Sequence, residues 1–327
     1  MHKWLKENLV CPRDYSDLQL RGDCLVCLQG HSYPIVDGIP VLLLEESEPT
    51  GGAALATLRQ IKEQGESSFA DRDANIEGPI DSFVQAQIAA TNGRLYIPLV
   101  GKLKRYPIPY LRMPDGDGLA FLDIGCNWGR WSIAAARKGY AVVGIDPSMD
   151  AIKAARRVSR QCDVTASFIV GDARHLPFRD ETFDTVFSYS VLQHLSKGNV
   201  RRSLISIARV LKPGGTCLVQ MPNKFGVVSM YHQLRRGFKS PSEFMVRYWA
   251  PRELVREFYS YFGSVALSVD GYFGLGIQMA DAEMLPRRYK LVVYLSELIG
   301  SISQRFPVLV RFADSLYVKS ANTSPAA

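Results

Sequence analysis

The sequence predicts a doubly wound α/β fold, in which helices cover both faces of a mainly parallel sheet. From about residue 119 onward, short apolar segments alternate with helical patterns, and this alternation is typical of parallel strands joined by crossover helices. Turn residues and acids follow the first apolar segments. The expected strands are residues 121–124, 141–145, 167–170, 185–188 and 217–220, and the expected helices between them are residues 130–138, 149–160 and 200–211.

The composition is that of an ordinary globular chain. Of its 327 residues, 47% are hydrophobic and 22% are charged. No run of about 18 apolar residues predicts a transmembrane helix, and the first residues lack the apolar core of a signal peptide. We therefore expect a cytoplasmic protein whose six cysteines remain thiols or metal ligands. The net charge of +7 permits an anionic partner.

Changes in composition divide the chain into four stretches. The first is β-rich, because Asp37-Gly38 predicts a tight turn between two apolar strands. An acidic segment with breaker residues follows it as a linker. The four stretches are residues 1–44, the β-rich unit; 45–118, the linker and a helical, aromatic region; 119–273, the α/β core with an insertion at about 222–250; and 274–327, a C-terminal helical extension.

The loop after the first core strand is a candidate ligand site. It runs from Leu122 to Arg130 as LDIGCNWGR. Gly125 and Gly129 let the backbone turn tightly, and Asn127 is among the residues that best tolerate a positive φ. The G-x-G-x-x-G fingerprint of a dinucleotide site is absent, because Asn127 and Arg130 stand where its second and third glycines would be.

Acidic residues end the next two strands. Asp146 follows the second strand, where an acid can accept hydrogen bonds from ribose hydroxyls, and Asp172 follows the third. Ligands of open α/β sheets bind outside the carboxyl ends of the strands, so these acids and Asp123 face the same site. The alternative is that the three carboxylates are solvated caps of their strands.

Three further segments carry a family resemblance. They are VGDA at residues 170–173, FDTVFSYS at 183–190 and RVLKPGG at 209–215. Together with the glycine loop and the acid at 146, they resemble the class I S-adenosylmethionine-dependent methyltransferases, particularly the branch of ubiquinone and menaquinone biosynthesis. The resemblance covers about residues 120–222. It implies a Rossmann-like, seven-stranded, mainly parallel sheet and S-adenosylmethionine as cofactor.

The resemblance also implies which residues bind the cofactor. Glycine is commoner in the family at the position of Asn127, and we expect the asparagine to be accommodated. The implied roles are the methionine end of the cofactor for Asp123, Gly125, Cys126, Asn127 and Gly129; the ribose for Asp146; the adenine for Asp172 and Ala173; and backbone near the sulfonium for Ser188.

Proton removal from the acceptor is the chemistry that the protein itself would supply. A hydroxyl acceptor must lose a proton, which requires a positioned base. His194 follows the fourth strand, and a histidine has an ordinary pKa of about 6.5. We take His194 as the candidate base and Tyr189 as a candidate wall of the acceptor pocket. The alternative is that His194 packs against or caps the next helix.

The first stretch resembles a zinc ribbon. The pattern is Cys11-Pro12-Arg13-Asp14, then Cys24-Leu25-Val26-Cys27, then Gly30-His31. It is similar to the small zinc-ribbon activator of tRNA and release-factor methyltransferases, and to the ribbon of some rRNA guanine methyltransferases. Zinc takes four ligands, so Asp14 would replace a thiolate beside Cys11. The second pair is either Cys27 with His31 or Cys24 with Cys27, and the alternative is a metal-free ribbon held by apolar strands.

Segments outside the resemblance are expected to form the acceptor site. The candidates are residues 96–110 and residues 222–249. In the second, basic residues interleave with aromatic ones, and a solvated basic face is the alternative. The side chains concerned are Tyr231, His232, Phe238, Phe244, Tyr248 and Trp249 with Arg235, Arg236, Lys239 and Arg247.

Residues 287–303 predict an amphipathic helix near the C-terminus. Its apolar stripe is Leu291, Leu295, Leu298 and Ile302. We favour docking of this helix onto the protein body. Peripheral contact with an anionic membrane is the alternative, and Arg287, Arg288 and Lys290 would suit it. Residues 261–272 are expected to close the sheet.

These patterns predict methyl transfer to a small-molecule, glycan or lipid-linked acceptor, as by an O-methyltransferase of a biosynthetic pathway. The alternative is methylation of an rRNA or tRNA base, with the ribbon gripping nucleic acid. An aromatic-rich candidate lid and the lack of a long basic run favour the first. The fourth strand also lacks the Asn/Asp-Pro-Pro-aromatic box that is linked with methylation of exocyclic base amines.

Overall fold

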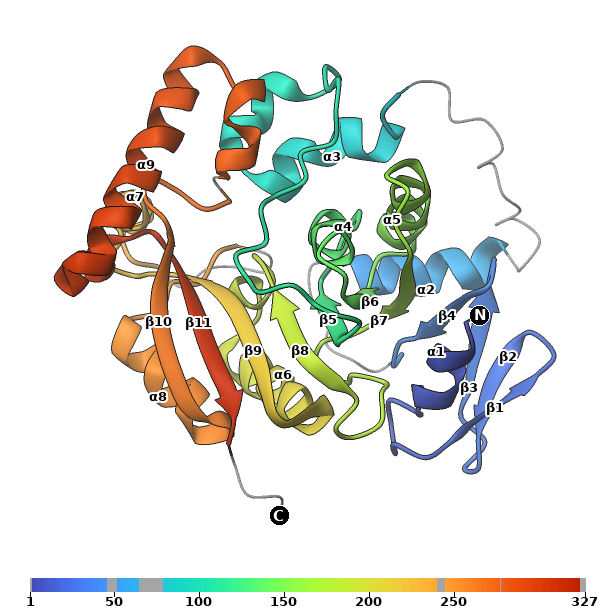
Figure 1. Cartoon of the computed structure of the whole chain (residues 1–327). Helices are drawn as coiled ribbons and strands as arrows, with labels where there is room; N and C mark the ends of the chain where they lie inside the picture. Colours follow the sequence, from blue (N-terminus) through green and yellow to red (C-terminus); the bar gives the residue numbers. More distant parts are fainter. Residues whose placement is uncertain (1, 46–51, 65–78, 240–244, 277, 324–327) are drawn as a thin grey trace.

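One continuous sheet organises the molecule. The structure, a computed structural model, describes residues 2–45, 52–64, 79–239, 245–276 and 278–323 (Figure 1). The strand order is β1-β2-β3-β4-β7-β6-β5-β8-β9-β11-β10. The core strands are β5 (Ala120–Ile124), β6 (Ala141–Asp146), β7 (Ala166–Gly171), β8 (Phe183–Ser188), β9 (Leu211–Pro222), β10 (Gly263–Gly271) and β11 (Ser315–Asn322).

The core strands confirm the predicted α/β class. Strands β7, β6, β5, β8 and β9 are parallel neighbours, whereas β11 pairs antiparallel with both β9 and the edge strand β10. Every strand and helix expected between residues 121 and 220 is present. The helices that alternate with them are α4 (Arg130–Ala136), α5 (Met149–Gln161), the short η4 (Leu192–His194) and α6 (Lys197–Val210).

Side chains of successive strand residues enter different layers of the core. Leu122 of β5 packs in one cluster with residues of α6 and of α8 (Pro251–Phe262). Its neighbour Phe121 packs in another cluster with Trp131 of α4. This alternation follows from the period of two along a strand, and it places helices on both faces, as a doubly wound sheet requires.

The expectation of seven strands is exceeded, because the N-terminal unit joins the sheet. Strand β4 pairs in parallel with β7, with Val41 opposite Val170 and Leu42 opposite Gly171. This pairing covers the edge of β7 that would otherwise expose its backbone groups. The elements of this unit are α1 (Lys3–Asn8), β1 (Leu18–Arg21), β2 (Cys24–Cys27), β3 (Ser32–Val36) and β4 (Ile39–Leu42).

The N-terminal unit also shares the core of the larger domain. The rings of Trp4 and Phe183 meet edge to face at 5.8 Å, and Leu9 forms a β-bridge with Phe178. Leu5 lies in the same buried cluster as the β5 side chains. The unit is therefore packed against the α/β core over strand β8 and the loop before it.

The C-terminal stretch is only partly helical, contrary to its description as a helical extension. Residues 315–322 form β11, which lies between β9 and β10. The side chains of its first four residues are buried on both faces of the sheet, because the strand lies between two neighbouring strands. Residues 261–272 thus supply one closing strand, β10, and the chain end supplies the other. The elements between them are η5 (Met279–Met284), α9 (Arg287–Arg305) and η6 (Pro307–Phe312).

Helix α9 docks on the protein body, but not through its predicted apolar stripe. The buried side chains are Val293, Ser296 and Ser303, and the Ser296 hydroxyl accepts from the backbone N–H of Tyr272 at 2.9 Å. Small side chains on that face let the helix lie close to β10. The stripe faces outward, with exposed fractions of 68% at Leu291 and 58% at Leu298. Among the described residues, no helix combines the length and apolar character needed to span a membrane.

Candidate functional site

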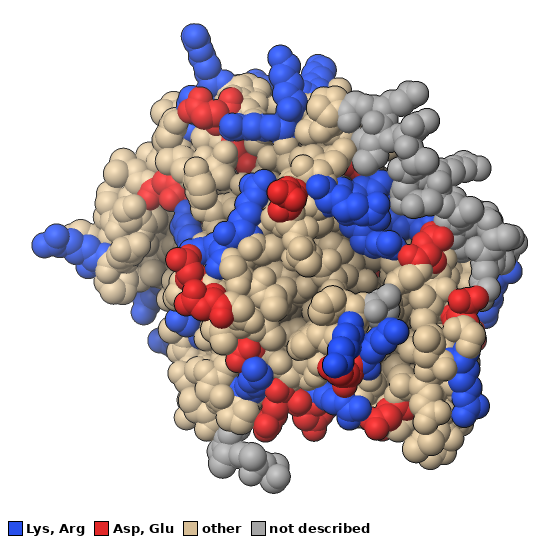
Figure 2. Space-filling model, turned by 45° about the vertical axis from the view of Figure 1, so that its right-hand side comes forward, with Lys and Arg blue, Asp and Glu red and all other residues tan. Residues whose placement is uncertain are grey.

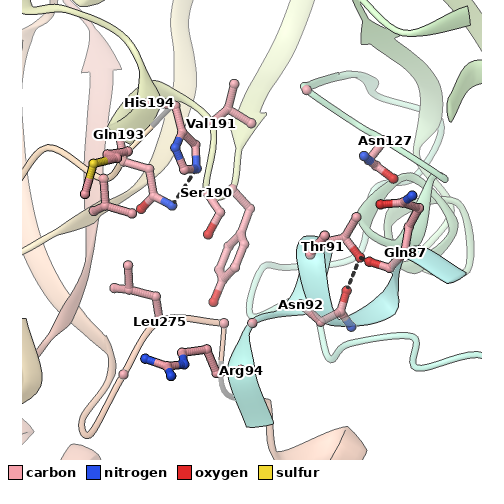
Figure 3. Close-up of a pocket in the computed structure, with 18 of the residues that line it drawn as sticks. Gln87, Thr91, Asn92, Arg94, Asn127, Ser190, Val191, Gln193, His194 and Leu275 are labelled. Atoms are coloured by element: carbon pink, nitrogen blue, oxygen red, sulfur yellow. Dashed lines mark hydrogen bonds between the residues drawn. The ribbon is translucent and has the colours of Figure 1, made fainter. Parts of the chain in front are cut away.

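A cavity of about 1080 Å³ lies at the carboxyl ends of the core strands. Its walls come from the loops after β5, β6 and β8, from α3 (Ser82–Asn92) and η3 (Arg94–Leu99), and from α7 (Val227–Arg235). Residues 245–248 and 273–276 complete it. Figure 3 shows Asn127 on one side of this cavity and His194 with Gln193 on the other. The cavity therefore joins the predicted cofactor loops to the predicted acceptor segments.

The loop after β5 has the backbone that its residues predict. Gly125 has φ 70° and Asn127 has φ 46°, so both adopt left-handed conformations. A Cβ at position 125 would lie 2.2 Å from Cγ2 of Val191. Only glycine fits there. Both residues line the cavity, where the loop leaves room for a ligand.

Asp146 ends β6 and lines the same part of the cavity. Its carboxylate accepts from the backbone N–H of Asn127 at 3.0 Å and from that of Ser148 at 2.9 Å. Burial raises the pKa of this carboxyl to about 6. The two backbone donors fix its orientation and leave further lone pairs for hydroxyl donors.

Six other predicted cofactor residues do not line the cavity. Asp123 is buried beneath it and accepts from the Ser132 hydroxyl at 2.7 Å. Burial, and then the nearby Asp146 carboxylate, raise the pKa of Asp123 to about 7. The hydroxyl of Ser188 donates to the carbonyl of Ile124. The six residues are Asp123, Cys126, Gly129, Asp172, Ala173 and Ser188.

Asp172 is engaged by its neighbour Arg174. The backbone N–H of Arg174 donates to Asp172 Oδ1 at 2.9 Å, and its Nε lies 3.0 Å from both carboxylate oxygens. Both side chains are buried. Arg174 therefore already donates hydrogen bonds to both oxygens of the Asp172 carboxylate. The bond from an adenine amino group to Asp172 stays a prediction, and this geometry does not favour it.

His194 and Tyr189 both line the acceptor side of the cavity. The amide nitrogen of Gln193 lies 3.2 Å from His194 Nε2 (Figure 3). The Tyr189 hydroxyl donates to Asp270 at 2.7 Å and accepts from Gln278 at 3.0 Å. Burial and the Asp270 carboxylate raise the pKa of Tyr189 well above its ordinary value. Tyr189 is therefore held as a neutral hydroxyl.

The lid differs in part from the predicted one. Phe83, Gln87 and residues 90–95 line the cavity in place of residues 96–110. Tyr96 is buried with its hydroxyl against Asp281. Residues of the second predicted segment do line it, including His232 and Tyr248. Trp249 lies in the core, and Phe244 lies outside the described residues.

A buried polar network beneath this wall could not be predicted from the sequence. Asp270 accepts from the Ser315 hydroxyl at 2.6 Å, and Ser315 in turn accepts from Gln220 at 2.7 Å. Gln220 also accepts from the backbone N–H of Ser190 at 2.9 Å. These residues lie on β10, β11 and β9, so only knowledge of the strand order would have brought them together.

Four of the five candidate zinc ligands converge in the N-terminal unit. Donor atoms of Cys11, Asp14, Cys27 and His31 all lie within 4.8 Å of one another. The distances from His31 Nδ1 are 3.5 Å to Cys11 Sγ, 3.3 Å to Cys27 Sγ and 3.0 Å to Asp14 Oδ2. Zinc bonds of about 2.0–2.3 Å in a tetrahedron place ligand atoms about 3.3–3.8 Å apart. The cluster therefore fits the size of a zinc site.

Cys24 does not belong to this cluster. Cys24 and Cys27 lie at opposite ends of β2, three positions apart, and the strand period of two turns them to opposite faces. The structure thus favours Cys27 with His31 as the second pair. Asp14 is oriented by Ser16, whose backbone N–H and hydroxyl both donate to Oδ1, leaving Oδ2 toward the cluster.

The family match agrees with this fold and site. Residues 121–215 match the methyltransferase domain family. The parallel sheet and the glycine loop agree with this match to a methyltransferase domain over residues 121–215. The match begins after the N-terminal unit and α3 and ends before α7. The N-terminal unit and the elements of the lid therefore lie outside it.

Similar proteins were found for part of the chain. The ubiquinone biosynthesis O-methyltransferase of Rhizobium etli is 34% identical over 108 residues, which are 33% of this chain and 43% of that protein. The demethylmenaquinone methyltransferase of Tropheryma whipplei is 38% identical over 128 residues, 38% of this chain and 51% of that protein. The chain thus spans about half of these relatives or less. A solved methyltransferase of Methanosarcina mazei is 20% identical, covers 68% of this chain and 100% of its own, and has a TM-score of 0.47.

Proposed function

We propose that this protein transfers the methyl group of S-adenosylmethionine to an oxygen of a small-molecule, glycan or lipid-linked acceptor in a biosynthetic pathway. The observation that carries the proposal is the single cavity that Asp146 and His194 both line. The matched relatives are named for ubiquinone and menaquinone biosynthesis, which favours a small acceptor. None of the six cysteines forms a disulfide, which fits a cytoplasmic enzyme whose cysteines are thiols or metal ligands.

The residues around the β5 loop fit the cofactor. The left-handed Gly125 and Asn127 leave space at the sheet edge, and Asp146 offers the acceptor that ribose hydroxyls need. Bound S-adenosylmethionine supplies an activated methyl group. The protein then has to orient the acceptor in line with that group and keep water out, which accounts for much of the rate enhancement.

We assign removal of the acceptor proton to His194. It lines the cavity beside Ser190 and Gln193, and a positioned base is what a hydroxyl acceptor requires. Tyr189 is a poor candidate for this step, because its hydroxyl already donates to Asp270 and its pKa is raised well above the ordinary value. Tyr189 instead shapes the wall of the acceptor pocket.

RNA base methylation, the alternative, has less support. The relatives are named for quinones and not for nucleic acids. The four-residue cluster of the N-terminal unit has the donor set of a structural zinc site. We propose that it holds zinc and stabilises the fold of this unit, without requiring a contact with RNA.

We further propose that the outward stripe of α9 contacts an anionic membrane surface. Leu291, Leu295, Leu298 and Ile302 are all exposed, and Phe306 and Phe312 continue the apolar surface. Contiguous exposed apolar surface of this kind marks an interaction site. The exposed basic residues at its two ends are Arg287, Arg288, Arg305 and Arg311.

The charges favour a membrane over a second copy of the chain. A two-fold dimer places the same patch on both subunits, so antiparallel α9 helices would bring Arg287 and Arg288 close to Arg305 of the partner helix. Like charges would then face each other. An anionic lipid surface attracts the same residues, at about 1 kcal/mol for each basic side chain near the surface.

The experiment for the proposed activity compares metabolites and RNA with and without the gene. Extracts of cells lacking the gene would be incubated with the purified protein and methyl-labelled S-adenosylmethionine, and then analysed by mass spectrometry. We expect one small or lipid-linked product heavier by one methylene group. Label in RNA alone would overturn the proposal. Heat-denatured protein is the negative control, and the Asp146→Ala protein should give less product at low concentrations of S-adenosylmethionine.

A further inference from the structure

The acceptor side of the cavity is lined by basic side chains from two separate elements. Arg94 begins η3, and His232, Arg235 and Arg236 lie on α7 or directly after it. Figure 3 shows the Arg94 side chain extending from η3 to lie alongside Leu275, with Ser190 and His194 on the other side of Leu275 in this view. The elements η3 and α7, which are far apart in the sequence, thus both contribute arginines to the lining of one cavity.

These charges have little compensation in the cavity. Asp146 is the only acidic residue among the described cavity-lining residues, and it belongs to the cofactor loops. Asp314, which lies near α7, is buried and accepts from the backbone N–H groups of Ser229 and Phe273. Within the described part of the chain, none of the ion pairs involves Arg94, Arg235 or Arg236.

The basic groups lie close enough to influence one another. Burial lowers the pKa of His232, and the charges of Arg94, Arg235 and Arg236 lower it further. The charge of Arg236 also lowers the pKa of Arg247, after the larger effect of burial. The arginines from η3 and α7 thus lie within electrostatic range of His232, together with the opposing charge of Asp314.

Contacts with neighbouring residues hold the Arg236 side chain of this cluster in place. Arg236 donates to the carbonyl of Val246 at 3.2 Å and its guanidinium lies 5.6 Å from the centre of the Tyr248 ring. Its Nε–H is buried without an acceptor among the described residues, and so is the amide nitrogen of Asn92. Both atoms have less than 1 Å² of accessible surface, so they do not face the cavity themselves. Arg236 lines the cavity through its other atoms.

We propose that this end of the cavity binds a phosphoryl group carried by the methyl acceptor, an inference that rests on the proposed methyltransferase function. Guanidinium groups match phosphate oxygens in geometry and stay charged at any physiological pH. A phosphate monoester brings a charge of about −1.5 to −2, which suits three arginines better than the single charge of a carboxylate does. The phosphoryl group would anchor the acceptor, and its reacting oxygen would reach toward His194.

The test measures binding of inorganic phosphate, pyrophosphate and acetate to the full-length protein by calorimetry, with S-adenosylhomocysteine present. We expect phosphate and pyrophosphate to bind, pyrophosphate more tightly, and acetate to bind far more weakly. Each of Arg94→Gln, Arg235→Gln and Arg236→Gln should weaken pyrophosphate about tenfold, the order expected for one charge-assisted hydrogen bond. Replacing an arginine by lysine keeps the charge and loses the fork, so its effect should be smaller.

Arg256→Gln is the matched control. Arg256 is exposed on α8 and does not line the cavity, so this variant loses the same charge and should bind pyrophosphate like the wild type. Affinity should fall with added salt in the wild type, and this salt dependence should nearly vanish in the triple Arg94/Arg235/Arg236→Gln variant. S-adenosylhomocysteine should bind the triple variant as tightly as it binds the wild type.

The outcomes separate this inference from the proposed function. If S-adenosylhomocysteine binds but pyrophosphate does not, or if the triple variant binds pyrophosphate unchanged, the basic side chains are a solvated face and the inference is wrong. Acetate binding as tightly as phosphate would also overturn it. If S-adenosylhomocysteine itself fails to bind, the proposed function falls.

Competition then identifies the source of the phosphoryl group. Displacement of pyrophosphate by glucose 6-phosphate would support a water-soluble phosphate monoester. Displacement by phosphatidylcholine vesicles containing phosphatidic acid would support a lipid phosphate. A single-stranded RNA that competes better than both would overturn a small acceptor at this end of the cavity.

Discussion

The backbone N–H of Asn127 donates to the carboxylate of Asp146 at 3.0 Å. This bond joins the loop after β5, in which Asn127 has a left-handed φ, to the end of β6. Asp146 is thereby held at the cavity wall before any ligand arrives. Because its orientation is fixed in advance, a ligand that uses this carboxylate loses less entropy on binding.

Asp146→Ala should weaken S-adenosylhomocysteine binding about tenfold or more. The variant removes the acceptor for the ribose hydroxyls, and a charge-assisted hydrogen bond contributes about 1.5–3 kcal/mol. Calorimetry with the purified protein checks this. Wild-type protein that binds NAD tightly and ignores S-adenosylhomocysteine would contradict the assignment of the cofactor site.

The same binding should depend on pH in a direction set by Asp146. Burial raises the pKa of its carboxyl to about 6, and the ionised form is the better acceptor for ribose hydroxyls. Affinity for S-adenosylhomocysteine should therefore rise as the pH increases through about 6 and level off above it. In Asp146→Asn this rise should disappear. A wild-type affinity that is flat between about pH 5 and 8 would show that the ligand does not use this carboxylate.

Asp123 should make the folded protein less stable as the pH rises toward and past neutrality. Its pKa is about 7 in the folded protein against an ordinary value of 3.8, so between these values the folded state binds more protons than the unfolded state. The free energy of unfolding then falls with rising pH. Asp123→Asn should remove the contribution of Asp123 to this slope, which urea titrations should show between about pH 4 and 7 and most separably between about pH 6 and 7, above the pKa of about 6 of Asp146. Asp150→Asn, an exposed acid on α5, should keep the wild-type slope.

Elemental analysis should find about one zinc per chain. The double variant Cys11→Ser/Cys27→Ser should lose the metal and unfold at lower temperature, because binding of a structural zinc contributes to folding. Cys24→Ser is the control, since Cys24 lies outside the cluster, and it should keep the metal. A metal-free wild-type protein that is folded and active would show that the apolar strands alone hold the N-terminal unit.

Vesicle sedimentation tests the stripe of α9. Vesicles with anionic lipid should bind the wild type, and Leu291→Ser/Leu298→Ser should reduce the partition coefficient at least tenfold, because burial of each leucine contributes about 1.5–3 kcal/mol. The control Ile205→Ser changes an exposed apolar residue on α6 and should bind like the wild type. Dimers that the double serine variant loses, without vesicle binding, would instead identify the stripe as an interface between copies.

The parts of the fold that sequence predicts are those fixed by local chemistry. Strand–helix alternation predicts β5 to β9, and the tolerance of Asn127 for a positive φ is confirmed. The position of β11 could not be predicted, because nothing in residues 315–322 indicates that they lie between β9 and β10. The pairing of β4 with β7 is equally non-local.

The candidate site residues also divide into those that local sequence predicts and those that depend on non-local packing. Asp146 and His194 were found because Asp146 ends β6 and His194 lies in the segment after β8, and both line the cavity. Arg94 was missed, because its place in the cavity depends on how η3 packs against distant elements. The apolar period of α9 predicts its stripe correctly, but periodicity shows only that a helix has two faces. Which of them is buried was decided by Ser296 and Ser303, whose small side chains allow contact with β10.

Substitution of His194 separates proton transfer from packing. A general base contributes about 10²–10⁴-fold to turnover, so His194→Ala should lower kcat by that factor. Its affinity for S-adenosylhomocysteine should remain nearly unchanged, since the imidazole faces the acceptor side of the cavity. His194→Gln keeps the approximate size and a hydrogen-bonding group beside Gln193, yet it cannot take a proton. It should therefore be almost as impaired as the alanine variant.

A packing role gives the opposite pattern and a different pH profile. If His194 only supports the loop after β8, glutamine should restore most of the activity and alanine should lower the melting temperature. An imidazole base with the ordinary histidine pKa of about 6.5 makes kcat/KM for the acceptor fall below that pH. The assay must use saturating S-adenosylmethionine, so that protonation of Asp146 does not add its own effect. In the residual activity of His194→Gln this fall should be absent or displaced. A glutamine variant with wild-type turnover would show that the acceptor loses its proton without His194.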